Sequence, residues 1–148
     1  MTEKNVLILA HQTAQSEELA EAVHARAAAG PVRFTLVVPS IAPGLHKVVD
    51  PTEHGDRAAH AAMEAALPVL EEAAGAPVEG QIGDSNPLDA AQDAVNLGDF
   101  DEIIVSTLPH RVSAWLRLDL PHKLEGLGLP VTAVTAESAD REYPSVEV

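Results

Sequence analysis

Short apolar runs alternate with longer amphipathic stretches along this chain. Apolar residues recur three or four positions apart in two stretches, which predicts helices at 14–29 and 53–74, and residues 83–87 open a third predicted helix that runs to about Leu97. Strand-like runs precede, separate and follow these stretches, which predicts five strands, at 5–10, 32–38, 78–82, 102–106 and 129–134. The segment between the last two strands, 107–128, is irregular and ends in a further helix.

This alternation predicts a single α/β domain whose strands form a doubly wound parallel sheet with helices on both faces. In such a sheet, ligands bind beyond the carboxyl ends of the strands, at the point where the strand order reverses. The residues that follow the strands are therefore the first candidates for a site. They are residues 11–13, 39–40, 83–85 and 106–107.

Prolines and capping residues mark the helix boundaries. Pro68 lies inside the second predicted helix and predicts a kink or a break there, because proline has no backbone N–H. Polar residues 84–86 precede Pro87, and Asp119 precedes Leu120 and Pro121, so both places predict helix N-caps. We expect the domain to span 1–135 and an acidic, loosely held tail to span 136–148.

Composition narrows the class of protein. The chain has 148 residues, of which 46% are hydrophobic and 22% charged, and its net charge is -14. So acidic a surface disfavours nucleic acid and anionic membranes as partners. The chain contains no cysteine, which excludes disulfides and thiolate chemistry. It has neither a membrane-length apolar run nor a signal-peptide pattern at its start, so a cytoplasmic protein is expected.

One segment departs from the acidic average. Residues 106–124 contain Arg111, Arg117 and Lys123 but a single acid, Asp119. Because the segment follows the fourth predicted strand, it favours a small anionic ligand, most simply a phosphate. The alternative is that these cations are solvated helix residues that offset neighbouring acidic helices.

Single residues admit two interpretations each. His11 and Thr13 could hydrogen-bond a base or a ribose; alternatively, Thr13 or Ser16 caps the first helix and His11 is a partly exposed loop residue. Trp115 is expected to pack in the core or a dimer contact, with base stacking as the alternative.

A polar cluster between positions 46 and 60 could suggest a metal, but it lacks a His-x-x-x-His or Glu-x-x-His pair, so no metal site is predicted. Its members are His46, Asp50, Glu53, His54, Asp56 and His60.

Two segments resemble the universal stress protein family: DEIIVS at 101–106 and LPVTAV at 129–134. The order and lengths of the elements over about 4–135 are also similar to that family. The resemblance implies a five-stranded sheet of order 3-2-1-4-5 and a homodimer formed through the last strand, 129–134. It also implies an adenine nucleotide as the first cofactor to consider.

The nucleotide-binding motif of that family is altered here. Gly-x-x-Gly, nine residues and then Gly-Ser or Gly-Thr follow the fourth strand in such members, and these positions hold Ser106, Pro109, Asp119 and Leu120 here. The acidic residue that ends the family's first strand falls near His11. Because glycines allow backbone amides to approach phosphates closely, the resemblance implies a divergent member without the usual ATP cradle.

The sequence therefore favours a regulatory protein that is not an enzyme, needs no cofactor and acts through dimerisation and protein partners. No esterase elbow, phosphate loop or dinucleotide fingerprint occurs in it. The alternative is a sensor of nucleotides or other anions, or a weak nucleotide hydrolase, that uses side chains of 106–122. The candidate ligand-binding residues are His11, Thr13, Ser40, Ser106, Thr107, His110, Arg111, Ser113, Arg117 and His122.

Overall fold

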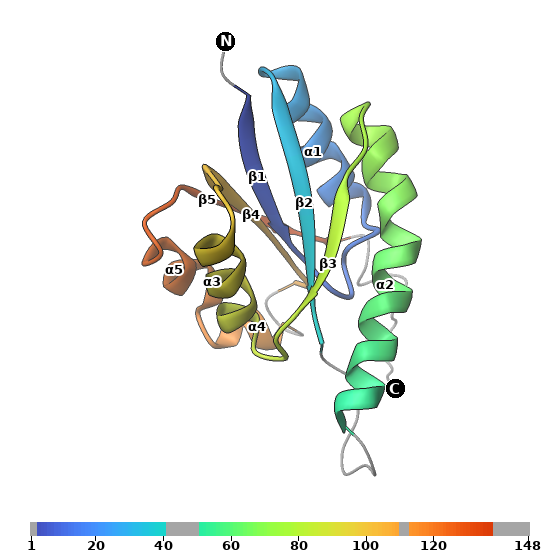
Figure 1. The fold of residues 1–148 in the computed structure, drawn as a ribbon, viewed down its shortest axis with the longest axis vertical. Helices are drawn as coiled ribbons and strands as arrows, with labels where there is room; N and C mark the ends of the chain where they lie inside the picture. Colours follow the sequence, from blue (N-terminus) through green and yellow to red (C-terminus); the bar gives the residue numbers. More distant parts are fainter. Residues whose placement is uncertain (1–2, 41–50, 110–112, 138–148) are drawn as a thin grey trace.

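Five parallel strands form one sheet in the order β3–β2–β1–β4–β5 (Figure 1). The computed structural model describes residues 3–40, 51–109 and 113–137. Both the predicted parallel sheet and its predicted strand order are confirmed. The strands are β1 (Lys4–Leu9), β2 (Val32–Pro39), β3 (Glu79–Gly83), β4 (Glu102–Thr107) and β5 (Val131–Thr135).

Helices cover both faces of the sheet, as predicted. Two of them, α1 (Glu17–Ala28) and α2 (Pro51–Ala74), lie on one face. The other face is covered by α3 (Pro87–Leu97), α4 (Ala114–Arg117) and α5 (Leu120–Glu125) (Figure 1). Within the described residues, no helix is both long enough and apolar enough to cross a bilayer.

Alternate residues of the central strands pack into two separate cores. In β1, Val6 and Ile8 face α1 and α2, whereas Leu7 and Leu9 face α3 and α5, and all four are fully buried. This alternation follows from the two-residue repeat of a strand. It explains why the three central strands, β1, β2 and β4, contain consecutive apolar residues rather than an apolar residue at every second position.

Three local predictions need correction. The first helix begins at Glu17, after Ser16, rather than at Ala14. Pro68 does not break α2, which runs without interruption through it. Asp119 does precede α5, but its side chain makes no capping hydrogen bond, because its backbone is left-handed, with φ of 61°. The predicted cap before α3 is confirmed, since Asn86 accepts hydrogen bonds from two amides of that helix.

Pairing along β4 differs on its two sides. With β1 the register ends at Leu9 opposite Val105. With β5 it continues for two residues more, through Ser106 opposite Val134 and on to the last pair of β5. On its other side β1 also ends at Leu9, opposite Val37, and the Ala10 N–H donates to the Val37 carbonyl at 3.3 Å. The strand order reverses between β1 and β4, and we call the carboxyl end of this strand pair, where their register ends, the switch point.

Candidate functional site

Two buried hydroxyls meet at the switch point. Thr13 Oγ1 lies 2.6 Å from Ser106 Oγ, although the two residues are 93 positions apart in the chain. Their residues are only 2% and 1% exposed. The structure therefore brings together two of the candidate residues, one from the loop after β1 and one from the end of β4.

The loop after β1 buries three polar residues, His11, Thr13 and Ser16, while Gln12 and Gln15 are exposed. The Ala14 N–H donates to the His11 carbonyl at 3.2 Å, and the Ser16 N–H donates to the Thr13 carbonyl at 3.0 Å. Ser16 Oγ in turn accepts from the Leu19 N–H and caps α1. Of the two predicted caps, Ser16 is therefore correct, and Thr13 is directed to Ser106 instead. His11 is 8% exposed, so the interpretation of a partly exposed loop residue is wrong.

Two further candidates extend the sheet edge on either side. Thr107 is buried beside Ser106, and its carbonyl accepts from the Ala136 N–H at 2.8 Å. Ser40 follows β2, and its backbone N–H donates to the Gly83 carbonyl at 3.1 Å, so it continues the β2–β3 pairing. Both residues lie at the carboxyl edge, as predicted.

Two of the candidate residues in the segment after β4 have polar contacts within the chain, and their role in binding a ligand stays a prediction. Ser113 is buried, but its Oγ accepts from the Leu116 N–H at 3.0 Å and so caps the start of α4. His122 is exposed on α5, and its Nδ1 lies 3.9 Å from Glu125 Oε1. Trp115 packs against the core on the α3 side, which confirms the core interpretation. His110 and Arg111 lie outside the described residues, and Arg117 ends α4 with a side chain outside them.

Two positions of the altered motif, Pro109 and Asp119, lie in the backbone after β4. Pro109 is buried and has no N–H to offer a ligand. Asp119 adopts the left-handed conformation that favours glycine, with its N–H donating to the Leu116 carbonyl at 3.0 Å. The chain thus keeps a glycine-like turn at Asp119 while losing one amide donor at Pro109.

Only part of the polar cluster between positions 46 and 60 lies within the described residues. His60 is exposed on α2, while the side chains of Glu53, His54 and Asp56 lie outside the described residues, as do His46 and Asp50 altogether. Among the described residues, no group of three potential ligands gathers.

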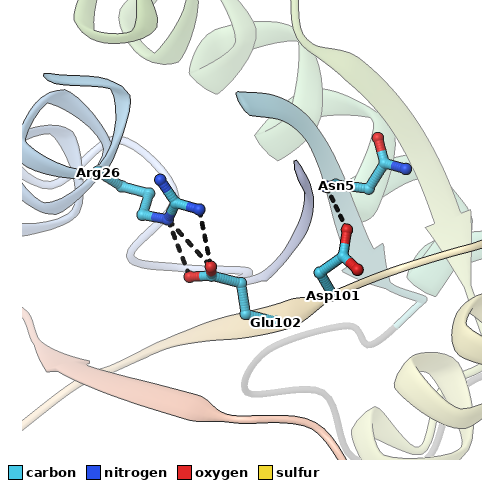
Figure 2. Close-up of polar contacts among 4 residues, drawn as sticks. All are labelled: Asn5, Arg26, Asp101 and Glu102. Atoms are coloured by element: carbon cyan, nitrogen blue, oxygen red, sulfur yellow. Dashed lines mark hydrogen bonds and ion pairs between the residues drawn. The ribbon is translucent and has the colours of Figure 1, made fainter. Parts of the chain in front are cut away.

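The opposite, amino-terminal end of the β1–β4 pair holds a charged network that sequence reasoning missed (Figure 2). Arg26 Nε donates to both carboxylate oxygens of Glu102 at 3.0 Å, and its Nη2 donates to Oε2 at 2.9 Å. This hydrogen bonding raises the pKa of Arg26 above its usual range. Beside it, the Asn5 N–H donates to Asp101 Oδ2 at 2.8 Å. No sequence signal joins Arg26 to Glu102, because their meeting depends on how α1 is rotated against the sheet.

These features define a class: a doubly wound α/β domain with its polar site at the carboxyl edge of a 3-2-1-4-5 sheet. No protein-family model matches the sequence, and no curated protein matches it. Solved structures do match.

A universal stress protein in complex with cAMP has a TM-score of 0.64 and 14% identity, over 90% of this chain and 98% of that one. A universal stress protein from Archaeoglobus fulgidus has a TM-score of 0.61 and 15% identity, over 88% and 93%. The universal stress protein from Archaeoglobus fulgidus in complex with dAMP has a TM-score of 0.59 and 15% identity, over 90% and 98%. This chain therefore has the universal stress protein fold.

Proposed function

We propose that this protein is a universal stress protein-like cytoplasmic regulator. It acts through homodimerisation and protein contacts rather than catalysis, and it does not hold ATP as nucleotide-binding members of that family do. The hydroxyl pair at the switch point carries the proposal. Thr13 and Ser106 are buried and hydrogen-bonded to each other at 2.6 Å, at the place where the first glycine of the family motif would stand.

A phosphate chain requires several donors aimed at one place. At this edge the Ser106 hydroxyl is already hydrogen-bonded to Thr13 Oγ1, and Pro109 contributes no N–H. A side chain at Ser106 also prevents the close backbone approach that a glycine permits. These features support a switch point closed to triphosphates.

The outer strand β5 supports the dimer. Its middle residues, Thr132 and Ala133, are exposed, and its sequence contains neither a charge nor a proline. Strands at a free edge are usually protected by such residues. The opposite edge strand, β3, does carry a charge, Glu79, as well as two glycines that weaken pairing. Pairing of two copies through β5 is therefore favoured over pairing through β3.

Calorimetry tests the ligand part of the proposal. ATP, ADP and AMP are titrated into the purified protein, each with and without magnesium. We expect no binding heat at millimolar nucleotide. Micromolar binding of ATP would overturn this part.

A second candidate function is an anion sensor that uses side chains of 106–122. Two observations favour it: Arg111 and Arg117 fall in the one basic segment of the sequence, and two structures of the same fold were solved with the monophosphates cAMP and dAMP. It would involve His11, Thr13 and Ser106 at the switch point. cAMP and AMP binding that is lost in Arg111→Ala but kept in Arg33→Ala would establish it. Arg33 is a matched control, because it is an exposed arginine on β2 paired only loosely with Glu3.

Sedimentation velocity tests the dimer. Thr132→Asp places a charge in the middle of β5, and Gln81→Asp places the same charge on the exposed middle of β3. We expect the wild type and Gln81→Asp to sediment as dimers and Thr132→Asp to sediment as a monomer. Equal masses for the two variants would contradict pairing through β5.

A further inference from the structure

We infer that the Thr13–Ser106 hydroxyl pair couples the switch point to the β5 edge. The pair holds the end of β4 in the position from which the last residues of β5 are paired, so opening the pair loosens those residues. The coupling within one chain is independent of the proposed function. Its consequence for pairing between copies rests on the proposed dimer.

The end of β4 depends on this pair because its backbone pairing to β1 stops early. β1 ends at Leu9, so the β1–β4 register stops at Leu9 opposite Val105, whereas β4 continues to Thr107. Ser106 thus lies one residue beyond the last backbone pair with β1. Where that pairing ends, the 2.6 Å hydrogen bond between Thr13 Oγ1 and Ser106 Oγ links the end of β4 to the loop after β1.

The last part of β5 depends in turn on the end of β4. Val134 and Thr135 pair with Ser106 and Thr107, and the Ala136 N–H donates to the Thr107 carbonyl at 2.8 Å. Ala136 is fully buried. Two of the five register pairs of β5 therefore involve the two β4 residues that extend past β1.

The position of Thr13 is fixed by hydrogen bonds on both sides of it. Two backbone hydrogen bonds close the turn that carries Thr13, and Ser16 caps α1 directly after it. Motion at the pair is therefore expected to appear at the β4 end and in β5 rather than in α1. A ligand or partner group that competes for either hydroxyl would act on the β5 edge by the same route.

Hydrogen exchange measured by mass spectrometry tests the inference. Thr13→Val removes the hydroxyl while keeping the side-chain volume. The control, Thr35→Val, makes the same change at a buried threonine of β2, on the far side of β1 from β4. Loss of one buried hydrogen bond predicts exchange about three- to ten-fold faster at residues 131–136 in Thr13→Val. No such change is expected there in Thr35→Val.

Two further variants keep the test decisive. Thr13→Ser retains the hydroxyl and should exchange like the wild type at 131–136. Ser106→Ala removes the partner hydroxyl, and Thr13→Val combined with Ser106→Ala should be no faster than either single variant. Equal exchange of Thr13→Val and Thr35→Val at 131–136, or acceleration spread evenly over the chain, would overturn the coupling.

Sedimentation of the same variants separates this inference from the proposed dimer. If the wild type is a monomer, the dimer proposal fails, while the exchange result at 131–136 still decides the coupling. If the wild type is a dimer, the coupling predicts weaker dimerisation of Thr13→Val, by a similar factor of about three to ten. An unchanged exchange pattern in a dimeric protein overturns the coupling alone.

Discussion

The two ends of the β1–β4 pair are held by different chemistry. At the amino end, Arg26 donates three hydrogen bonds to the Glu102 carboxylate, and Asp101 accepts one from the Asn5 N–H (Figure 2). At the carboxyl end, the contact is between two neutral hydroxyls, those of Thr13 and Ser106. Charges with fixed partners stabilise one geometry, whereas a hydroxyl can donate or accept and can exchange its partner.

This difference between the two ends of the β1–β4 pair assigns folding stability to the amino end and function to the carboxyl end. The side chains of Arg26 and Glu102 are 21% and 24% exposed and already paired with each other, so they have little left to offer a ligand. The carboxyl end lies where a parallel sheet opens between two strands, which is where this class of fold binds its ligands. Substitutions at the two ends should therefore produce different phenotypes: loss of folding stability at one, and changes in edge pairing or ligand response at the other.

The largest effect is expected from breaking the charged network. Arg26→Ala removes three charge-assisted contacts and leaves Glu102 half-buried without its partner, so we expect a loss of about 2 kcal/mol in the free energy of unfolding. The control is Arg33→Ala, whose pair with Glu3 is exposed and 3.5 Å long, and which should cost about 0.5 kcal/mol or less. Urea denaturation followed by circular dichroism measures both. Equal losses would mean that the amino-end network is no more important than a surface pair.

A medium effect is expected at a helix that starts from the carboxyl edge. Asn86 Oδ1 accepts from the Leu88 and Asp89 amides at the start of α3, at 2.9 and 3.2 Å. Asn86→Ala should therefore lower the free energy of unfolding by about 1 kcal/mol. Asn96→Ala, at an exposed position of the same helix, should be neutral or slightly stabilising because alanine favours helix. Equal denaturation midpoints for the two variants would show that this cap adds nothing.

The sequence was sufficient for the fold because its signals are local. The three central strands contain short apolar runs and the long helices have an amphipathic repeat, so the element order, and with it the parallel sheet, could be predicted. The boundaries were less secure. The serine that caps α1 was one of two candidates, and Pro68 suggested a break that α2 does not have. A long helix packed along the sheet can tolerate the loss of one backbone hydrogen bond.

The site could be predicted only as far as parallel topology dictates it. Thr13 and Ser106 were both expected at the carboxyl edge, because the ends of neighbouring parallel strands meet there. Their direct contact and the burial of His11 could not be predicted, since both depend on the turn of the loop after β1. The contact of Ser113, whose Oγ accepts from the Leu116 N–H at the start of α4, could not be predicted either, and its role in binding a ligand stays a prediction.

A smaller effect is expected where Asp119 holds a left-handed backbone. Its φ of 61° strains a residue with a Cβ, and its exposed side chain makes no capping hydrogen bond. Asp119→Gly relieves the strain but also gives the unfolded chain more freedom, so we expect a net gain of about 0.5 kcal/mol. Asp119→Ala should instead be destabilising, because alanine tolerates this conformation less well. Thermal melts of both variants test the turn, and a more stable alanine variant would contradict the strain argument.

The smallest expected effect concerns pH, and it sharpens the contrast between the two ends. The hydrogen bonds that Arg26 donates to Glu102 raise the pKa of Arg26, so the folded state binds this proton more tightly than the unfolded chain does. The contribution of Arg26 is then fully present below the arginine's ordinary pKa and is lost only in strongly alkaline solution. We therefore expect the stability difference between wild type and Arg26→Ala to change by less than about 0.3 kcal/mol between about pH 7 and about pH 10. Denaturation midpoints at the two pH values measure it, and a difference that collapses by pH 10 would mean that the Arg26–Glu102 contact is not what secures the amino end.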